Sequence, residues 1–177
     1  MKFIAMLRGI NVSGQKLIKM ADLRAALEKK GLKNVVTYIQ SGNILFDTSE
    51  KDPLKIAETI ENVIKKEFGF DVPCVVKTKE DFKFILDNND FLKAGKPEDR
   101  LYVTFLSKEP EIDNIKTIDP GQYVPEEFII KGSNLFFFSP EGYGKAKMNN
   151  NFFENKLKVK ATTRNWKTVN KLFELAQ

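Results

Sequence analysis

The stretch Ile39-Gln40-Ser41-Gly42-Asn43-Ile44-Leu45-Phe46 has the composition of a β-hairpin, because apolar residues flank a turn of serine, glycine and asparagine. A second stretch, Ile130-Lys131-Gly132-Ser133-Asn134-Leu135-Phe136-Phe137, repeats the pattern, with asparagine again following a Gly/Ser pair. A diverged duplication would explain this echo. Coincidence is the alternative, since turn chemistry alone favours these residues at such positions. Both hairpins indicate antiparallel sheets that the flanking segments must complete.

The segments around the first hairpin follow the order strand, helix, strand, strand, helix, strand, which is the split arrangement of a ferredoxin-like sandwich. Asp52 and Pro53 suit the N-cap and first turn of the second helix, and Gly69 is placed to end it. The expected strands are 2–7, 35–39, 44–46 and 73–76, and the expected helices are 20–30 and 53–68. The predicted buried stripe of the second helix consists of Leu54, Ala57, Ile60, Val63, Ile64 and Phe68.

The pattern restarts near residue 100, after a linking helix from Thr78 and a polar stretch at 88–100. We expect a last helix capped by Thr163, with Arg164 and Trp166 in its first turn and Trp166 facing the core. The remaining expected elements are strands 101–106, 128–130 and 135–138, a short helix within 110–118, helical spacing from Met148 to Leu157, and a very short strand at Val159 and Ala161.

The fold class expected from these patterns is α+β, with two ferredoxin-like (βαββαβ) halves and with linking and C-terminal helices. The predicted division is a first half at 1–77, a linking helix and loop at 78–99, and a second half with the C-terminal helix at 100–177.

The chain has no histidine and one cysteine, Cys74, which lies in an apolar strand. Ser-His-Asp and Cys-His catalysis are therefore excluded, and zinc and iron–sulfur sites are disfavoured. The acidic pairs Glu98-Asp99 and Glu126-Glu127 lack metal-ligand spacing, and we assign them to solvated surface. We expect no cofactor and no metal site, so any chemistry would rest on Lys, Arg, Asp, Glu, Tyr, Ser or Thr.

The net charge of +5 is distributed unevenly. Residues 1–47 carry eight Lys/Arg against three Asp/Glu, residues 48–144 carry thirteen against nineteen, and residues 145–171 carry eight against one. Basic ends and an acidic middle suggest an anionic partner or an acidic surface of the same chain, although a solvated lysine-rich exterior gives the same pattern. No apolar run is long enough to span a membrane, and no signal peptide is evident, so we expect a cytoplasmic protein.

The loop Arg8-Gly9-Ile10-Asn11-Val12-Ser13-Gly14-Gln15-Lys16 concentrates glycine, amide and basic groups. Its glycines have P-loop spacing, but the lysine comes one residue late and Leu17 stands where a hydroxyl residue belongs. A looser anion nest is the better hypothesis, with Arg8, Asn11, Lys16 and Lys19 as ligand-binding candidates. The alternative is a glycine-permitted turn in which Asn11 hydrogen-bonds its own backbone.

A second basic loop, Glu141-Gly142-Tyr143-Gly144-Lys145-Ala146-Lys147, precedes a predicted helix. Tyr143 could stack on a base, and lysines near a helix start suit a phosphate, a nucleotide or single-stranded nucleic acid. A flexible turn with solvated lysines is equally consistent with the sequence. The further ligand-binding candidates are Tyr143, Lys145, Lys147, Arg164 and Lys167, together with the neutral amides Gln40 and Asn43 of the first hairpin.

Four motifs in combination resemble a bacterial family catalogued as domain of unknown function 1697: Arg8-Gly9-Ile10-Asn11-Val12, Lys19-Met20-Ala21-Asp22-Leu23-Arg24, Tyr38-Ile39-Gln40-Ser41-Gly42-Asn43 and Thr163-Arg164-Asn165-Trp166-Lys167-Thr168-Val169. The resemblance spans nearly the whole chain. It implies an α+β fold with ferredoxin-like halves and no particular activity. The family commonly has Gly-Gly-Lys in the first loop, whereas this chain has Ser13-Gly14-Gln15-Lys16, which weakens any role tied to that lysine.

Three functions remain open from the sequence. The first is a non-enzymatic binding module for an anionic, phosphate-bearing ligand, with nucleic acid or a phosphorylated small molecule as partner. The second is a small enzyme or sensor acting on a phosphorylated metabolite or nucleotide in a cleft between the halves. The third is a structural or protein-interaction domain, including a homodimer. We expect no membrane partner. Convergence of loops 8–16 and 141–147 with residues 163–167 would favour the first two functions.

Overall fold

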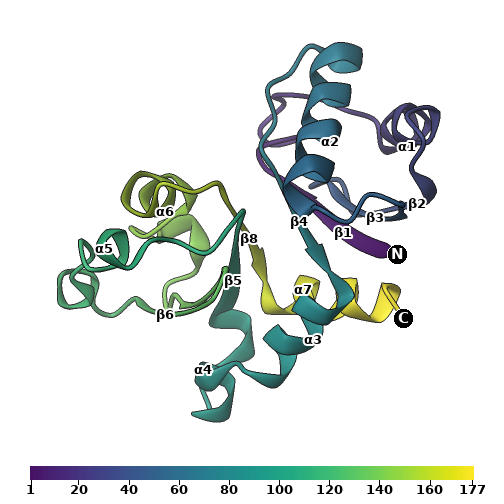
Figure 1. The fold of residues 1–177 in the computed structure, drawn as a ribbon. Coiled ribbons are helices and arrows are strands. Elements are labelled where there is room, and N and C mark those ends of the chain that lie inside the picture. Colours follow the sequence, from purple (N-terminus) through teal and green to yellow (C-terminus); the bar gives the residue numbers. More distant parts are fainter. The chain divides into compact units, whose positions relative to one another are not determined.

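The computed structural model describes residues 1–177 and contains two compact units. Met1–Phe82 and Leu172–Gln177 form the first unit, and Lys83–Lys171 form the second. Each unit has one four-stranded antiparallel sheet with helices (Figure 1). The expected α+β class with two ferredoxin-like halves is confirmed. No helix combines the length and apolar composition needed to cross a membrane.

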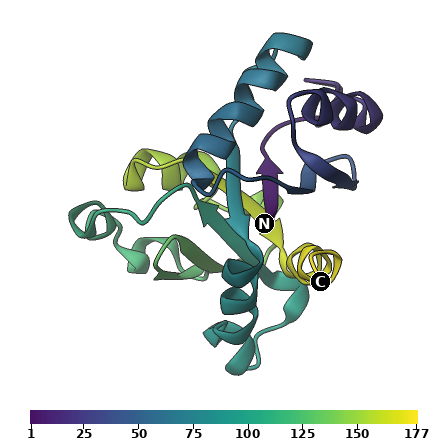
Figure 2. The ribbon, with the colours of Figure 1, turned by 45° about the vertical axis from the view of Figure 1, so that its right-hand side comes forward.

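The first unit has the strand order β2-β3-β1-β4. Helices α1 and α2 lie on the same side of its sheet (Figures 1 and 2), and both contribute to one apolar core with the strands. The elements are β1 (Lys2–Leu7), α1 (Met20–Lys29), β2 (Lys33–Tyr38), β3 (Asn43–Asp47), α2 (Pro53–Phe68) and β4 (Cys74–Thr78). These bounds confirm the element order predicted for the first half.

Local sequence signals explain the ends of α2. Asp52 is the N-cap, and its carboxylate accepts from the backbone N–H of Leu54 at 2.9 Å. Gly69 ends the helix at φ +76°, a conformation in which glycine has no Cβ penalty. One predicted stripe residue is wrong: Leu54 is 49% exposed, whereas Ile56 is buried. Leu54 lies roughly a third of a turn from the centre of the buried stripe, so its side chain faces solvent.

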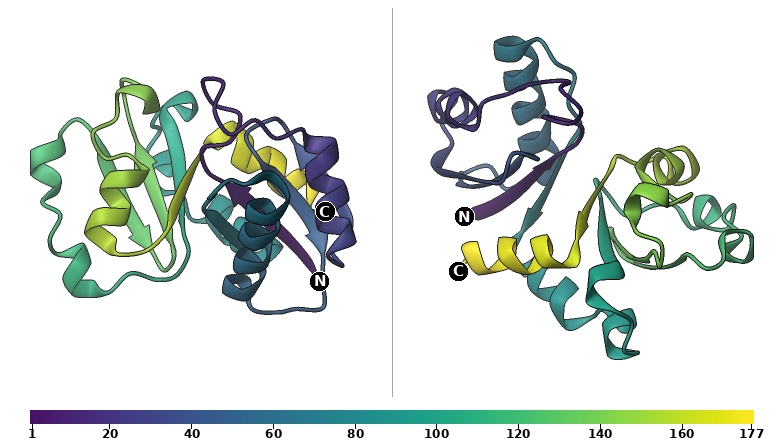
Figure 3. Two further views of the ribbon diagram at one scale, coloured as in Figure 1. Left: turned by 90° about the horizontal axis from the view of Figure 1, so that it is seen from above. Right: turned by 180° about the vertical axis from the view of Figure 1, so that it is seen from behind.

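The second unit repeats the sheet order as β6-β7-β5-β8. Figure 3 shows α6 against this sheet, and its side chains pack into a core rich in phenylalanine. The elements after β4 are α3 (Lys79–Asp87), α4 (Asp90–Lys93), β5 (Leu101–Leu106), α5 (Ile112–Ile115), β6 (Glu127–Lys131), β7 (Asn134–Phe138), α6 (Asn150–Leu157), β8 (Ala161–Asn165) and α7 (Trp166–Leu175). Strand β7 is buried along its whole length, including the three consecutive phenylalanines.

The end of the second unit differs from the prediction. Thr163 does not cap a helix, because it lies in β8 opposite Thr104 of β5, and the two hydroxyl oxygens are 2.8 Å apart. Asn165 caps α7 instead, since its Oδ1 accepts from the N–H of Thr168 at 2.8 Å. Arg164 is therefore a strand residue. Trp166 is only 3% exposed, so its predicted core position is confirmed.

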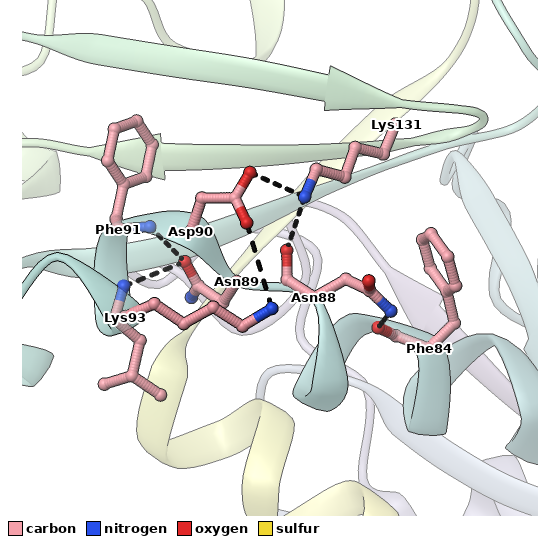
Figure 4. A network of polar contacts seen from close by, with 8 residues as sticks. Phe84, Asn88, Asn89, Asp90, Phe91, Lys93 and Lys131 are labelled. Atoms are coloured by element: carbon pink, nitrogen blue, oxygen red, sulfur yellow. Dashed lines mark hydrogen bonds and ion pairs between the residues drawn. The ribbon is translucent and has the colours of Figure 1, made fainter.

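The stretch at 88–100 contains a short helix that the sequence patterns missed. Asn89 caps α4, and its Oδ1 accepts from the N–H groups of Phe91 and Leu92. Figure 4 shows how this helix is tied to the β6–β7 hairpin: Lys131 lies 2.7 Å from the Asp90 carboxylate and donates to the Asn88 carbonyl at 2.9 Å. The hydrogen bond from Lys131 lowers the pKa of Asp90.

The two units match in the hydrogen bonds at the end of their first strands. The N–H of Leu7 donates to the Gly42 carbonyl at 2.8 Å, and the N–H of Leu106 donates to the Ser133 carbonyl at 3.0 Å. The next residue in each case donates to the segment before the last strand, at Pro73 or Lys160. The equivalence therefore extends beyond element order to individual backbone contacts.

Candidate functional site

The first predicted loop is organised by the side chain of Asn11. Its Nδ2 donates to the carbonyls of Ile18 at 3.0 Å and Gln40 at 2.8 Å, and its Oδ1 accepts from the N–H of Ile18 at 2.9 Å. Both donors and the acceptor are thus occupied by backbone. Asn11 fastens the loop to the β2–β3 turn, which is close to the structural alternative considered from the sequence, and it is not available for a ligand.

The cations of the first loop differ in how freely they present their charge. Lys16 has φ +45°, and its Nζ donates to the Asp71 carbonyl at 2.6 Å. Arg8 is half-buried at the end of β1. Lys19 is exposed at the N-cap of α1 and makes no side-chain cap. Only Lys19 among the basic candidates of this loop therefore presents an exposed, unpaired ammonium.

The two amides of the first hairpin have opposite environments. Asn43 is fully buried, and its Nδ2 donates to the Tyr38 carbonyl and to Ser41 Oγ. Gln40 is exposed. Between them, Gly42 has φ +82°, and a Cβ there would lie 2.8 Å from side-chain atoms of Ile10 and of Leu7, so the turn requires glycine. Asn43 is a structural residue of the turn.

The second predicted loop is held by a network of hydroxyl groups. The Tyr143 hydroxyl lies 3.2 Å from Thr163 Oγ1 and accepts from the N–H of Asn150 at 3.0 Å. The N–H of Tyr143 donates to the Tyr102 hydroxyl at 3.2 Å, and the two tyrosine rings are 5.5 Å apart. Tyr143 is therefore packed, and its ring is no free stacking platform. The network brings loop 141–147 beside β8.

Glu126 corrects the assignment of the acidic pairs to solvated surface. Its side chain is 8% exposed, and its two carboxylate oxygens accept from the N–H groups of Lys147 at 2.7 Å and Met148 at 2.9 Å. Charge-assisted bonds of this kind offset the cost of burying the carboxylate. Glu126 thus fixes the end of the second loop and leaves the side chains of Lys145 and Lys147 exposed.

A hollow of about 520 Å³ lies beside the start of α7. Strand pairing forms one wall, because Tyr102 of β5 is the partner of Asn165 in β8. Helix α7 follows β8 directly and supplies Lys167, which is exposed. The lining consists of two aromatic side chains, two amides, one lysine and two carboxylates: Tyr102, Trp166, Asn165, Asn170, Lys167, Glu98 and Asp99.

One of the predicted residues, Lys167, lines the hollow. A second, Tyr143, is next to the lining, because its backbone N–H donates to the hydroxyl of the lining residue Tyr102. Arg164 is half-buried, and its Nη1 donates to Thr162 Oγ1 and to the Thr163 carbonyl. Loop 141–147 thus lies beside β8 through the contact of Tyr143 with Thr163, but none of its residues lines the hollow. Loop 8–16 belongs to the first unit.

The sequence patterns did not indicate one buried titratable side chain. Lys77 of β4 is 4% exposed, and burial lowers the pKa of its ammonium to about 8. The only signal for it is the position of a lysine within an apolar strand. Glu98 and Asp99 are exposed, as expected from the sequence, and they also line the hollow with Lys167. No group of three or more Cys, Asp or Glu side chains is arranged to hold a metal ion.

Comparisons with known proteins extend these observations. No curated protein matches the chain. A solved structure, the conserved bacterial protein SP0830 from Streptococcus pneumoniae, is similar in fold, with 24% sequence identity, a TM-score of 0.73 and coverage of 99% of this chain and 98% of that one. The model of a family described as proteins of unknown function, DUF1697, matches residues 1–136. The chain therefore belongs to the DUF1697 family, as the resemblance of its motifs implied.

Proposed function

We propose that the protein is a non-enzymatic binding module for an anionic, phosphate-bearing ligand, and that the hollow beside α7 binds it. The observation that carries the proposal is the position of Lys167. Lys167 is exposed and unpaired, and it lines a hollow that is also lined by the half-buried aromatic residue Tyr102. The volume of about 520 Å³ is within the range of small-molecule sites.

The start of α7 adds to the attraction for an anion. A helix N-terminus carries partial positive charge, and α7 has ten residues with no acidic side chain in its first turn. Asn165 and Asn170 offer amide groups to the rest of a ligand, because Asn165 Nδ2 and Asn170 Oδ1 make no hydrogen bond in the structure, whereas Asn165 Oδ1 caps α7. A phosphate near Lys167 with a polar, planar body against Tyr102 would use these groups together.

The carboxylates of the hollow favour a compact ligand over a long polyanion. Asp99 lies 3.7 Å from Arg100 Nε, which balances part of its charge, but Glu98 has no such partner. A continuous phosphate backbone passing Glu98 would be repelled, whereas the hydroxyls of a nucleotide or sugar phosphate can donate to a carboxylate. A phosphorylated small molecule is therefore the preferred ligand class, ahead of nucleic acid.

Isothermal titration with adenosine monophosphate, glucose 6-phosphate, inorganic phosphate and a single-stranded oligonucleotide tests the proposal. We expect one of the small phosphates to bind, and Lys167→Gln to weaken it about tenfold through the lost charge contact. Lys108→Gln is the matched control, because Lys108 is an exposed lysine of the same unit away from the hollow. Equal affinities in the two variants, or no binding by any probe, would overturn the proposal.

We also propose that the two units arose by a diverged duplication. The units share the strand order and the backbone contacts of Leu7 and Leu106. The echo between the hairpins at 39–46 and 130–137 falls at equivalent positions in the two sheets. A common origin accounts for these features together, and a binding site in one unit then reflects later specialisation of one copy.

A further inference from the structure

Strands β2 and β6 occupy the same edge position in their sheets. They differ in how charged side chains protect their free edges. Strand β6 is closed at both ends by ion pairs: Lys96 lies 2.7 Å from the Glu127 carboxylate, and Lys131 lies 2.7 Å from Asp90. None of its large apolar side chains is exposed. Charges placed in this way protect an edge strand from pairing with other chains.

Strand β2 lacks that protection over its second half. Val36 is 51% exposed, and Ile39, which follows the strand, is also 51% exposed. Irregular backbone is confined to the beginning of the strand, where Asn34 has φ +53° and the register with β3 shifts between Lys33 and Val36. An open edge with exposed β-branched residues is the template to which an extended peptide adds a strand.

The first loop carries two further exposed apolar side chains. Leu17 is 66% exposed and Val12 is 56% exposed. The loop lies against the end of β2, because Asn11 bonds the carbonyls of both Ile18 and Gln40. Leu17 and Ile39 each precede one of these two residues, so Asn11 links the two segments that carry them.

Charge identifies the occupant of this edge. Segments 8–24 and 33–43 contain five basic residues and one acidic residue: Arg8, Lys16, Lys19, Arg24 and Lys33 against Asp22. A second copy of the chain would bring like charges together, which disfavours pairing of β2 with itself. An acidic segment of another protein matches both the charge and the apolar side chains.

We propose that the free edge of β2, with Val36, Ile39 and Leu17, binds an extended acidic segment of a partner protein by β-strand addition. Main-chain hydrogen bonds to β2 supply affinity, apolar side chains of the segment contact Val36 within the strand and Ile39 just beyond its end, and its acidic side chains face Lys19. This inference does not depend on the hollow beside α7, which lies in the other unit.

Fluorescence anisotropy with the full chain and a labelled peptide of alternating aspartate and valine tests the inference. We expect measurable binding at peptide concentrations below about 1 mM. A peptide with lysine in place of aspartate, and one with alternate amides N-methylated, should each bind at least about tenfold more weakly, because they remove charge matching and main-chain pairing. In amide NMR spectra, the acidic peptide should shift the signals of β2 and leave those of β6 unchanged.

The variant Val36→Thr/Ile39→Gly removes the apolar contacts while keeping a β-branched residue in the strand and a permitted residue at φ +54°. It should weaken peptide binding about tenfold. Ile112→Ser, which changes a 68% exposed side chain of the second unit, is the control and should bind normally. Unchanged affinity in the double variant, equal binding of the lysine peptide, or no binding below about 1 mM overturns the inference. Two other results would also overturn it. One is a dimer of the unaltered chain in sizing chromatography that the double variant does not form, and the other is an oligonucleotide that binds the unaltered chain but not the double variant.

Discussion

The hairpins β2–β3 and β6–β7 share a sequence pattern but have different turns. In β6–β7, Lys131 pairs with Asn134 across two residues, and of these only Gly132 has positive φ, at +62°, as in a type II′ turn. In β2–β3, Tyr38 pairs with Asn43 across four residues, and Ile39 has φ +54°. Both turns accept a bond from the end of the first strand, at Leu7 or Leu106, and the longer turn also accepts a bond from the side chain of Asn11. The difference teaches that glycine, serine and asparagine encode a turn, while the neighbouring loop selects its geometry.

The asparagines that follow the two turns show the same contrast. Asn43 donates to Tyr38 and to Ser41, whereas Asn134 keeps a buried Oδ1 without a hydrogen-bond partner. Each unit nevertheless fixes one loop with one polar side chain, Asn11 in the first and Glu126 in the second. Substitutions at equivalent positions can therefore separate what the units share from what distinguishes them.

The largest effect is expected in the aromatic cores. Phe46 and Phe137 occupy equivalent hairpin positions, but the ring of Phe46 stacks on Phe3, whereas Phe137 contacts the rings of Tyr102, Tyr143 and Phe153. Phe137→Ala should lower the free energy of unfolding by about 3–5 kcal/mol, and Phe46→Ala by less. Chemical denaturation of both variants measures the difference. A larger loss for Phe46→Ala would contradict this ranking of the two cores.

The next effect concerns the last strands, where Lys77 opposite Ile4 and Arg164 opposite Val103 are equivalent. Burial lowers the pKa of Lys77 from 10.5 to about 8. Below pH 8 the ammonium is charged in both states, and burying that charge destabilises the folded state. As pH rises from 8 to 10.5, only the folded state releases its proton, so stability should rise by up to about 3 kcal/mol.

Denaturation at a series of pH values measures that rise, and Lys77→Met should lack it because the titrating group is gone. Arg164→Met is the control for the second unit. Its guanidinium stays protonated throughout this range, so its removal should leave the rise intact. A rise that persists in Lys77→Met would assign the titration to another group.

The two loop-fixing side chains come next. Glu126→Gln replaces one of two acceptors by a donor that faces a backbone N–H, and it should cost about 1–3 kcal/mol. Glu127→Gln is the matched control, because Glu127 is 47% exposed and its pairing with Lys96 is a surface contact. Thermal unfolding of the two variants compares them, and similar shifts would argue against the structural role of Glu126.

Asn11→Ala should cost somewhat less, about 1–2 kcal/mol, because its hydrogen bonds to Ile18 and Gln40 are part-buried and exposed, so the freed backbone groups can regain some hydrogen bonding with water. Gln15→Ala, an exposed change in the same loop, should be neutral. Amide exchange of Ile18 provides the local measurement. If that amide were protected equally in Asn11→Ala and in the unaltered protein, the hydrogen bonds of Asn11 would not be what holds the loop.

The smallest effect has opposite signs in the two turns. Ile39→Gly should stabilise the first by about 1 kcal/mol, because a β-branched residue at φ +54° is strained. Gly132→Ala should destabilise the second by a similar amount for the converse reason, since its φ is +62° and no atom crowds the position. Melting temperatures that moved in the same direction would contradict the difference between the turns.

Much of the fold could be predicted from residues near one another in sequence. Apolar periodicity indicated α2, the cap at Asp52 and the stop at Gly69 set its ends, and the two hairpins indicated both sheets. The miss at Thr163 has a non-local cause. Its hydroxyl suits an N-cap, but pairing of β8 with β5 keeps it in a strand and passes the capping role to Asn165. The short helix α4 likewise depends on Lys131, which is 41 residues beyond Asp90 in the sequence.

The candidate site divides in the same way. The sequence by itself determined the α+β class, the repeated element order, the absence of histidine chemistry and the basic character of the loops. Only the tertiary structure decided which polar side chains are available. Asn11 and Glu126 are occupied by backbone groups from distant segments and Asn43 by groups of its own turn, whereas Lys167 stays unpaired in a lining that also includes Tyr102. The physical reason is that a polar group's availability depends on which donors and acceptors folding brings within hydrogen-bonding distance.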